Sequence, residues 1–528
     1  MAGSCLVSLS SIVDVVLHVM ADISLWKQAM QKVAPFVVER LDYEPTNLNF
    51  GGSQTIFEVG KSGDLLWRTA LIMNFPGFKG AAGYTAVGDK SDQNINDLAG
   101  AGSITAAQKE TLLALPAESV AGRYTRAEAF RPYYVHGAPL QLIETIEVRI
   151  NQHTFDRHTG LFMDIEYDYS DASQRGLGSN LHKRPTVEAL QDASEHGFRA
   201  LVYLRFWHCL ASQNAYPLVC HGNINFSVQA RFRALSQVIV HPFGLAAFNA
   251  AGGAINVTNL QSTMKDGGVQ LLSYQVFLHN AERSVFWDNA QDYVFQQTQR
   301  VVEDARVPSG AATYEHQLNM TGPIRALYWC FTAASMASQA SFDTVTGYSW
   351  GGDESFANFQ LLVNGSIYND PLPAEVYRGG EAEAFGRSMP VGRYYAMMFA
   401  LQYDDFFQTT GSNALSRAET VKVRFGWAGT QANPNSPAAL ASDAYLQLYA
   451  VNLNVMRVKV RFLHKPQQTK PILTLSLFFV SFAERRHRNQ GKKFAQTSTK
   501  QTHTNTLCFC SWPSFKWLED YIVWTVCP

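Results

Sequence analysis

The sequence predicts an all-β protein whose two halves each suit a jelly roll. Apolar and polar residues alternate in many short segments after about residue 45, a pattern typical of strands with one buried face. Clusters rich in Gly, Asn, Asp and Pro separate these segments, as turns do. At 528 residues the chain is too long for one ordinary core, so two domains are expected.

The composition indicates a protein that covers part of its surface with partners. Charged residues make up 16% of the chain, against about 25% in an average protein. Aromatic residues make up 12%, and the formal net charge is -1. No overall attraction to nucleic acid or to a membrane is therefore expected, and self-assembly is the first hypothesis.

The seven cysteines are scattered and form no C-x-x-C pair, so reduced thiols are expected rather than a disulfide scaffold or a zinc ribbon. The N-terminal stretch has no basic region ahead of its apolar residues, and a signal peptide is not expected. No run approaches the ~20 apolar residues of a membrane span.

Individual elements follow from local patterns. The segment SGDLLWRTALIMNFPGF (62–78) is an apolar run between two turn signals, which predicts a buried strand. Residues 146–150 and 421–427 alternate strictly and predict strands. Helix is expected over three stretches, which are 105–118, 187–199 and 284–304.

A Gly-, Ala- and Asn-rich stretch near residue 250 divides the body of the chain. The predicted organisation is an N-terminal arm (1–39), a first jelly roll (40–240), a linker (241–266), a second jelly roll (267–458) and a basic C-terminal tail (459–528). The tail has eleven basic and three acidic residues, a net charge of +8. A basic arm for an anionic surface is one interpretation; a disordered appendage that is not native to the fold is the preferred one.

Four patterns in the sequence resemble catalytic or binding motifs, but none predicts a catalytic, cofactor or metal site. GYSWG (347–351) matches the nucleophile elbow around Ser349, but no helix and no suitable downstream Asp and His follow. GYTAVGDKS (83–91) resembles a phosphate-binding loop, but Asp89 displaces the Lys. Both are expected to be turn-rich loops.

The other two patterns are carboxylates and possible metal ligands. Asp164, Glu166 and Asp168 alternate in DIEYDY, which could bind calcium or serve a glycosidase, but the expectation is the solvated face of an edge strand. The remaining candidates match no common zinc spacing. They are His153, Asp156, His158, His208, Cys209, Cys220 and His221.

Seven stretches in chain order resemble one family, the double jelly-roll major capsid protein of nucleocytoplasmic large DNA viruses. They are residues 62–78, 142–165, 201–229, 271–297, 316–329, 392–417 and 445–458. Residues 62–78 are similar to an early strand of the first roll, and LLSYQVFLHNAERSVFWDNAQDYVFQQ (271–297) resembles the opening of the second. HQLNMTGPIRALYW (316–329) has the family's Asn-x-Pro-x-x-x-Leu-x-Trp pattern with departures. Thr410 and the Asn151-Gln152 turn also differ from the usual pattern and indicate a divergent member.

The resemblance implies two tandem eight-stranded antiparallel jelly rolls with short helices in loops. It implies a structural protein and not an enzyme. The implied assembly is a homotrimer, which forms pseudo-hexagonal capsomers in the icosahedral shell of a large double-stranded DNA virus. Neighbouring capsomers and minor capsid proteins are the implied partners, and an internal membrane beneath the shell is compatible with it. No cofactor and no specific nucleic acid are expected. The implied location is the virion capsid, assembled in the host cytoplasm.

Two other readings stay open at this point. A tandem jelly-roll protein that binds or cleaves glycans would be a monomer and would need the acids at 164–168. A minor capsid or penton protein usually needs one jelly roll, which the chain length disfavours.

Overall fold

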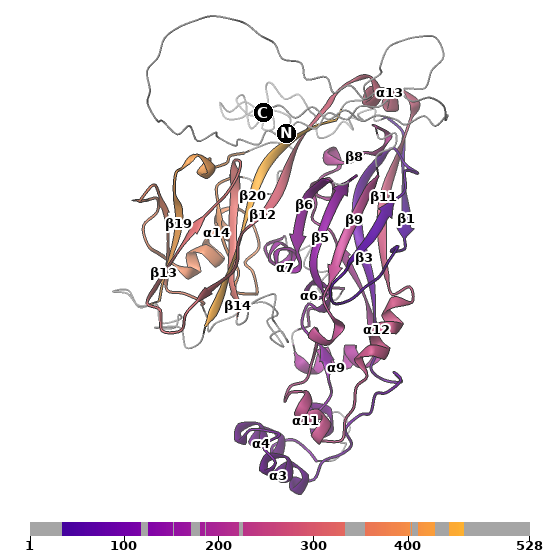
Figure 1. Cartoon of the computed structure of the whole chain (residues 1–528), viewed down its shortest axis with the longest axis vertical. Helices are drawn as coiled ribbons and strands as arrows, with labels where there is room; N and C mark the ends of the chain where they lie inside the picture. The colour runs from indigo at the N-terminus through magenta and orange to yellow at the C-terminus, as the bar shows by residue number, and fades with distance from the viewer. Residues whose placement is uncertain are drawn as a thin grey trace, which may run out of the picture.

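The computed structural model describes residues 34–117, 125–151, 153–170, 180–184, 186–220, 225–332, 354–401, 403, 410–427 and 443–458. Ser349, His221 and the basic tail lie outside them. The described chain forms two β-sandwiches side by side (Figure 1). Every pair between named strands is antiparallel. No helix in this part is long and apolar enough to cross a membrane.

The first roll consists of two facing four-stranded sheets, with the short strand β8 (Tyr216–Pro217) beside β3 and a two-stranded pair of β4 (Tyr133–Tyr134) and β10 (Ile239–Val240). One sheet has the order β1 (Phe36–Tyr43), β11 (Val269–Leu278), β3 (Leu65–Pro76) and β7 (Gly197–Tyr203). The other has the order β2 (Gln54–Val59), β9 (Phe226–Phe232), β5 (Ile143–Ile150) and β6 (His153–Thr159).

The second roll repeats this arrangement. One sheet has the order β12 (Gln291–Val307), β20 (Ala444–Val458), β14 (Ile324–Thr332) and β18 (Tyr395–Met398). The other has the order β13 (Thr313–Leu318), β19 (Val421–Gly426), β15 (Asn358–Val363) and β16 (Ser366–Ile367), with β17 (Leu372–Pro373) also paired to β15.

The two rolls share one topology. If the eight main strands of each roll are numbered along the chain, the sheets have the order 1-8-3-6 and 2-7-4-5 in both. The predicted all-β class with two antiparallel jelly rolls is therefore confirmed, and so are the predicted strands at 62–78, 146–150 and 421–427.

Short helices occupy the connections. They are α3 (Asp92–Gly100), α4 (Ala106–Leu113), α5 (Arg126–Ala129), α6 (Ala138–Leu142), α7 (Gly160–Tyr169), α9 (Val187–His196), α10 (Trp207–Leu210), α11 (Leu245–Ala250), α12 (Val257–Lys265), α13 (Asn280–Asp288) and α14 (Glu381–Ala384). Two of the three predicted helices are present as α4 and α9. The third ends early: β12 replaces it from Gln291 onward, because pairing with β20 along the whole strand overrides the local helix preference.

The predicted division of the chain differs from the structure in three places. β11 lies beyond the predicted boundary at 267, yet it pairs with β1 and β3 and so completes the first roll. In this topology the eighth strand of each roll lies between the first and the third strands, and β11 holds that place in the first roll. The predicted linker contains α11 and α12, which bury Phe248, Leu260 and Met264. The predicted arm overlaps β1 from Phe36 onward.

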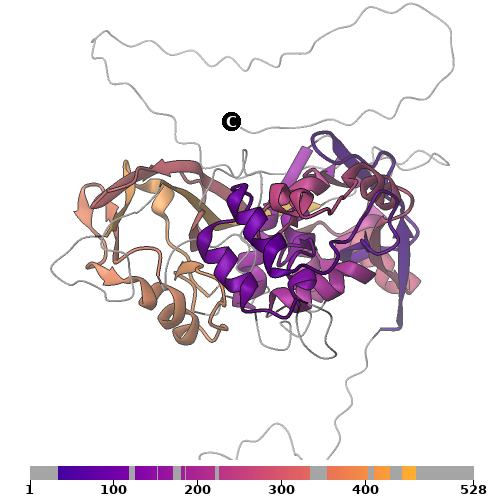
Figure 2. The ribbon, with the colours of Figure 1, turned by 90° about the horizontal axis from the view of Figure 1, so that it is seen from below.

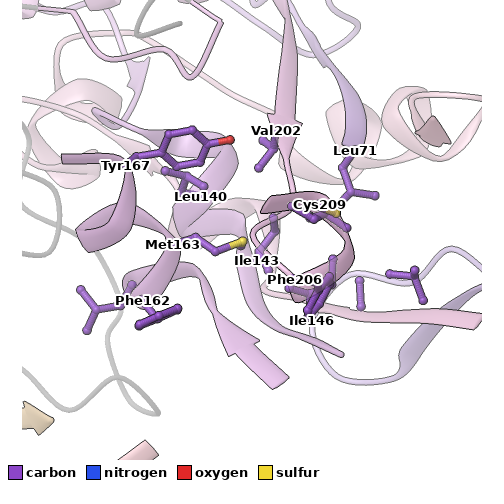
Figure 3. Close-up of a cluster of buried hydrophobic side chains, with 14 of the residues drawn as sticks. Leu71, Leu140, Ile143, Ile146, Phe162, Met163, Tyr167, Val202, Phe206 and Cys209 are labelled. Atoms are coloured by element: carbon purple, nitrogen blue, oxygen red, sulfur yellow. The ribbon is translucent and has the colours of Figure 1, made fainter. Parts of the chain in front are cut away.

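Three apolar clusters hold the molecule together. The first fills the first roll and continues to the second; Figure 3 shows its centre, where Met163 of α7 lies near Ile143 of β5, with Leu71 and Val202 contributed by the other sheet. The second lies inside the second roll. A small third cluster joins α3, α4 and α11 at the tip farthest from α13 (Figure 1).

Candidate functional site

The junction between the two rolls is the most elaborate polar and aromatic site that the structure describes. The sheet β12-β20-β14-β18 lies between the core of the second roll and the first roll. Leu327 and Trp329 of β14 point into the second-roll cluster, while Tyr328 and Cys330 belong to the cluster of the first roll. All nine residues of β14 are consequently buried, as expected for a strand covered on both faces.

The first roll covers this sheet chiefly with α7, the connection between β6 and β7. The Thr159 hydroxyl caps the helix by accepting a hydrogen bond from the Phe162 amide at 3.1 Å. Gly160 allows the helix to start close to the preceding chain, because a Cβ there would lie 1.9 Å from the Leu140 carbonyl oxygen. The predicted edge strand at DIEYDY is therefore wrong: these residues form a helix, and Asp164 and Glu166 are buried.

Asp164 and Asp168 share one face of α7, since residues four apart are neighbours on a helix. Both accept hydrogen bonds or ion pairs from Lys183 of the first roll, at 2.7 Å for Asp168. Each also reaches the second roll: the Tyr394 hydroxyl donates to Asp164, and the Gly392 amide donates to Asp168 at 3.0 Å. Burial alone would lower the pKa of Lys183, but the two carboxylates raise it above its ordinary value.

Glu166 points away from that face and meets a second cation. Its carboxylate lies 3.4 Å from the guanidinium of Arg387 and accepts a hydrogen bond from the Tyr403 hydroxyl at 3.0 Å. Arg387 also donates to the Tyr328 hydroxyl at 2.7 Å and to the Tyr169 carbonyl at 3.1 Å. Burial would raise the pKa of Glu166, but attraction by Arg387 and neighbouring groups holds it below its ordinary value.

The edge strands β6 and β12 form the second part of the junction. Gln297 donates to the Phe155 carbonyl at 2.7 Å, and the Thr298 amide donates to the Asp156 carboxylate at 3.0 Å. The hydroxyls of Thr159 and Tyr449 lie 2.7 Å apart. The edge strands β6 and β12 are therefore joined by hydrogen bonds that involve side chains, and not by backbone pairing into one continuous sheet.

A polar pocket of about 520 Å³ opens next to this contact. Its charged lining is largely paired: Arg157 donates to Glu147 at 3.0 and 2.8 Å, and Arg300 donates to Glu303. Nothing in this lining combines a nucleophile with a positioned base. The junction fixes the two rolls in one orientation, because separating them would part buried Glu166 from the cation of Arg387 and buried Asp164 from the Tyr394 hydroxyl.

The other predicted candidates lie apart from the junction network or serve the fold. In the loop 83–91, Ser91 caps α3 by accepting from the Asn94 amide at 3.3 Å. His158 lies 3.0 Å from Asp156 and stacks on Phe206. His208, Cys209 and Cys220 are buried in the first-roll core, the cysteines as free thiols. Within the described ranges no cluster of three His, Cys, Asp or Glu could hold a metal ion.

Sequence reasoning missed the cations and tyrosines of the junction. Arg387 is 221 residues from Glu166, and Tyr394 is 230 residues from Asp164, so no local spacing could bring them together. The available signal was the run IRALYWCFT, which is apolar on both strand faces. Such a run predicts a strand that is covered twice.

Part of the chain matches a known protein family. Residues 282–461 match the family described as large eukaryotic DNA virus major capsid protein. No curated protein sequence matches the chain.

The likeness to solved structures covers most of the chain. PBCV-1 VP54 is similar with a TM-score of 0.56 and 14% identity, over 82% of this chain and 97% of that chain. The capsid protein in a quasi-atomic structure of the PBCV-1 capsid gives 0.56 and 14%, over 83% and 98%. The Faustovirus major capsid protein gives 0.56 and 11%, over 84% and 94%. At these identities the shared property is the fold.

Proposed function

We propose that this chain is a major capsid protein of a large eukaryotic DNA virus and that it forms a homotrimer. The proposal is supported by the match of residues 282–461 to that family and by the double jelly-roll fold of the described chain. Three chains supply six similar rolls around a three-fold axis. The trimer is a pseudo-hexagonal capsomer that tiles the icosahedral shell of a large double-stranded DNA virus. Its role is structural and involves no catalysis.

The single observation that carries this proposal is the junction. A capsomer with near-hexagonal symmetry needs two equivalent rolls in one chain, held in a fixed relation. The shared strand order supplies the equivalence, and the sheet β12-β20-β14-β18, covered on both faces, supplies the fixed relation.

The proposal extends to partners and location. Neighbouring capsomers and minor capsid proteins are the proposed partners, with room for an internal membrane beneath the shell. The proposed site of assembly is the host cytoplasm. The hypothesis of a glycan-binding or glycan-cleaving protein loses its main support, because the acids at 164–168 form ion pairs with Lys183 and Arg387 inside the junction.

The test is the mass of the purified full chain in solution, measured by light scattering after gel filtration. The expected species has about three times the mass of one chain, and it should appear as a hexagonal outline in negative-stain micrographs. A monomer at micromolar concentration would contradict the proposal.

A further inference from the structure

The outer face of the sheet β1-β11-β3-β7 carries an apolar patch although nothing described covers it. Inward residues such as Leu71 and Leu271 are fully buried. The residues that alternate with them point away from the core and are only half-buried. The apolar patch on this face consists of Ile72, Leu201, Tyr203, Leu272 and Tyr274. Polar residues border it, among them Asp42, Arg199 and Gln270. A solvated sheet face is normally polar, and a patch of five large apolar side chains departs from that pattern.

The equivalent sheet of the second roll shows what such a face is for. There, Tyr328 and Cys330 of β14 and Tyr449 and Val451 of β20 are the outward residues, and the first roll buries all four. β14 and β20 are the third and eighth strands of their roll, as β3 and β11 are of theirs. The same position in the fold is thus covered in one roll and bare in the other.

The covering surface also has an equivalent. In the first roll it is the fifth strand, β6, with the connection that follows it. In the second roll the fifth strand is β16, and the connection that follows it contains β17. This corner exposes three large apolar side chains, Ile367 (58%), Tyr368 (50%) and Leu372 (39%).

The outer face and the corner lie on opposite sides of the molecule. The sheet with β1 forms one side of the view in Figure 1, and the sheet with β13 and β19, which also contains β16, lies on the other side. Figure 2 shows the same separation from below. Two different surfaces on opposite sides join copies head to tail, and such contacts close into a ring when the rotation permits.

We infer that the outer face of the sheet β1-β11-β3-β7 binds the β16–β17 corner of a second copy of this chain. The inference rests on the proposed trimer and gives its interface. The contact between chains then repeats the contact between rolls within a chain, so that all six junctions of the ring use equivalent elements.

Charge supports the same pairing. Arg40 and Arg68 are exposed on the sheet with the outer face and stack on Tyr274 and Trp67, at 5.7 and 4.7 Å from the ring centroids. Neither forms an ion pair with another described residue. Asp370 is exposed in the corner and is a carboxylate that a facing chain can bring to them.

The test introduces one charge into each surface of the full chain, as Leu272→Glu and Ile367→Glu. Each variant is expected to lower the mass from light scattering about threefold, with an unchanged circular dichroism spectrum. The matched control is Val285→Glu on α13, where the side chain is 48% exposed and outside both surfaces; it should keep the mass of the unsubstituted chain.

A second measurement does not depend on disrupting the assembly. Leu272→Cys and Ile367→Cys chains, co-expressed and oxidised, should form a disulfide-linked dimer that neither variant forms alone. If the unsubstituted chain is a trimer, but both Glu variants remain trimers and no mixed disulfide forms, the inferred interface is wrong and the trimer stands. If the unsubstituted chain is a monomer, the proposed function and the interface fail together.

Discussion

β3 and β14 hold the same place in their rolls, the third strand, but they are buried differently. β14 is buried along its whole length, whereas β3 alternates between buried and half-buried residues from Leu71 to Pro76. Their neighbours within the sheet are equivalent. The difference is what lies on the second face, which is the first roll for β14 and nothing described for β3. Burial along a strand therefore reports its place in the assembly as much as its place in the fold.

The largest expected effect breaks the cover on β14. Replacing Arg387 by Met leaves Glu166 buried without its cation and removes the bond to Tyr328. The free energy of unfolding should fall by about 3–5 kcal/mol, measured by urea denaturation of the purified chain. The control is Arg424→Met, which breaks a half-exposed pair with Glu315 and should cost about 0–1 kcal/mol. Equal losses for the two variants would show that Arg387 does not clamp the rolls.

A second prediction separates the rolls by acid sensitivity. Burial lowers the pKa of His182 and His208 to about 3 and that of His241 to about 4. All three lie in the first roll, whereas His316 is the only histidine between residues 291 and 458. Because these groups stay neutral when folded, the stability they confer is complete above their unfolded pKa near 6.5 and is lost as the pH falls toward 3.

The variant His208→Asn tests this sign. Each such histidine should cost about 2 kcal/mol at pH 5 relative to neutral pH, and the variant should lose that part of the slope. Thermal melting between pH 8 and pH 5 gives the slope. The control is Val285→Ala on α13, which alters an exposed apolar side chain, removes no titratable group and should leave the slope unchanged. A parallel shift of the His208→Asn curve at every pH would mean that only packing was altered.

The smallest expected effect sharpens the contact of the edge strands. Tyr449→Phe removes the hydroxyl that lies 2.7 Å from the Thr159 hydroxyl and keeps the ring. The loss should be about 1 kcal/mol in urea denaturation. The double variant with Thr159→Val should lose less than the sum of the single variants, because both remove one interaction. Strict additivity would indicate that the two hydroxyls are not coupled.

Local pattern predicted the strands whose two faces differ in polarity. Val421 and Val423 of β19 alternate with Lys422 and Arg424, and the structure has this strand. The pattern failed where tertiary contacts decide. The acids of α7 alternate as they would in a strand, but the Thr159 cap and burial on both sides make the segment a helix.

The prediction of the boundary between the two rolls failed for a related reason. Composition places a break near residue 250, but the first roll is completed only by β11, which pairs with β1 far earlier in the chain. The junction was equally out of reach, since the contacts of α7 with the second roll join residues that are more than two hundred positions apart. The sequence does show apolar residues on both faces of β3 and β14. This pattern indicates that both faces are covered, but it does not identify the covering surface.

The pairing of β1 with β11 sets an order of events during synthesis. Phe36 pairs with Leu278, and β11 is the strand that pairs with β1. β1 therefore has no strand partner until β11 has been synthesised. Domains usually fold as units while the chain emerges, and the first roll can close as a unit only after its last strand, β11, has emerged. Its opening strand must wait for β11 and the second roll must wait for β20, so the two rolls are completed in chain order.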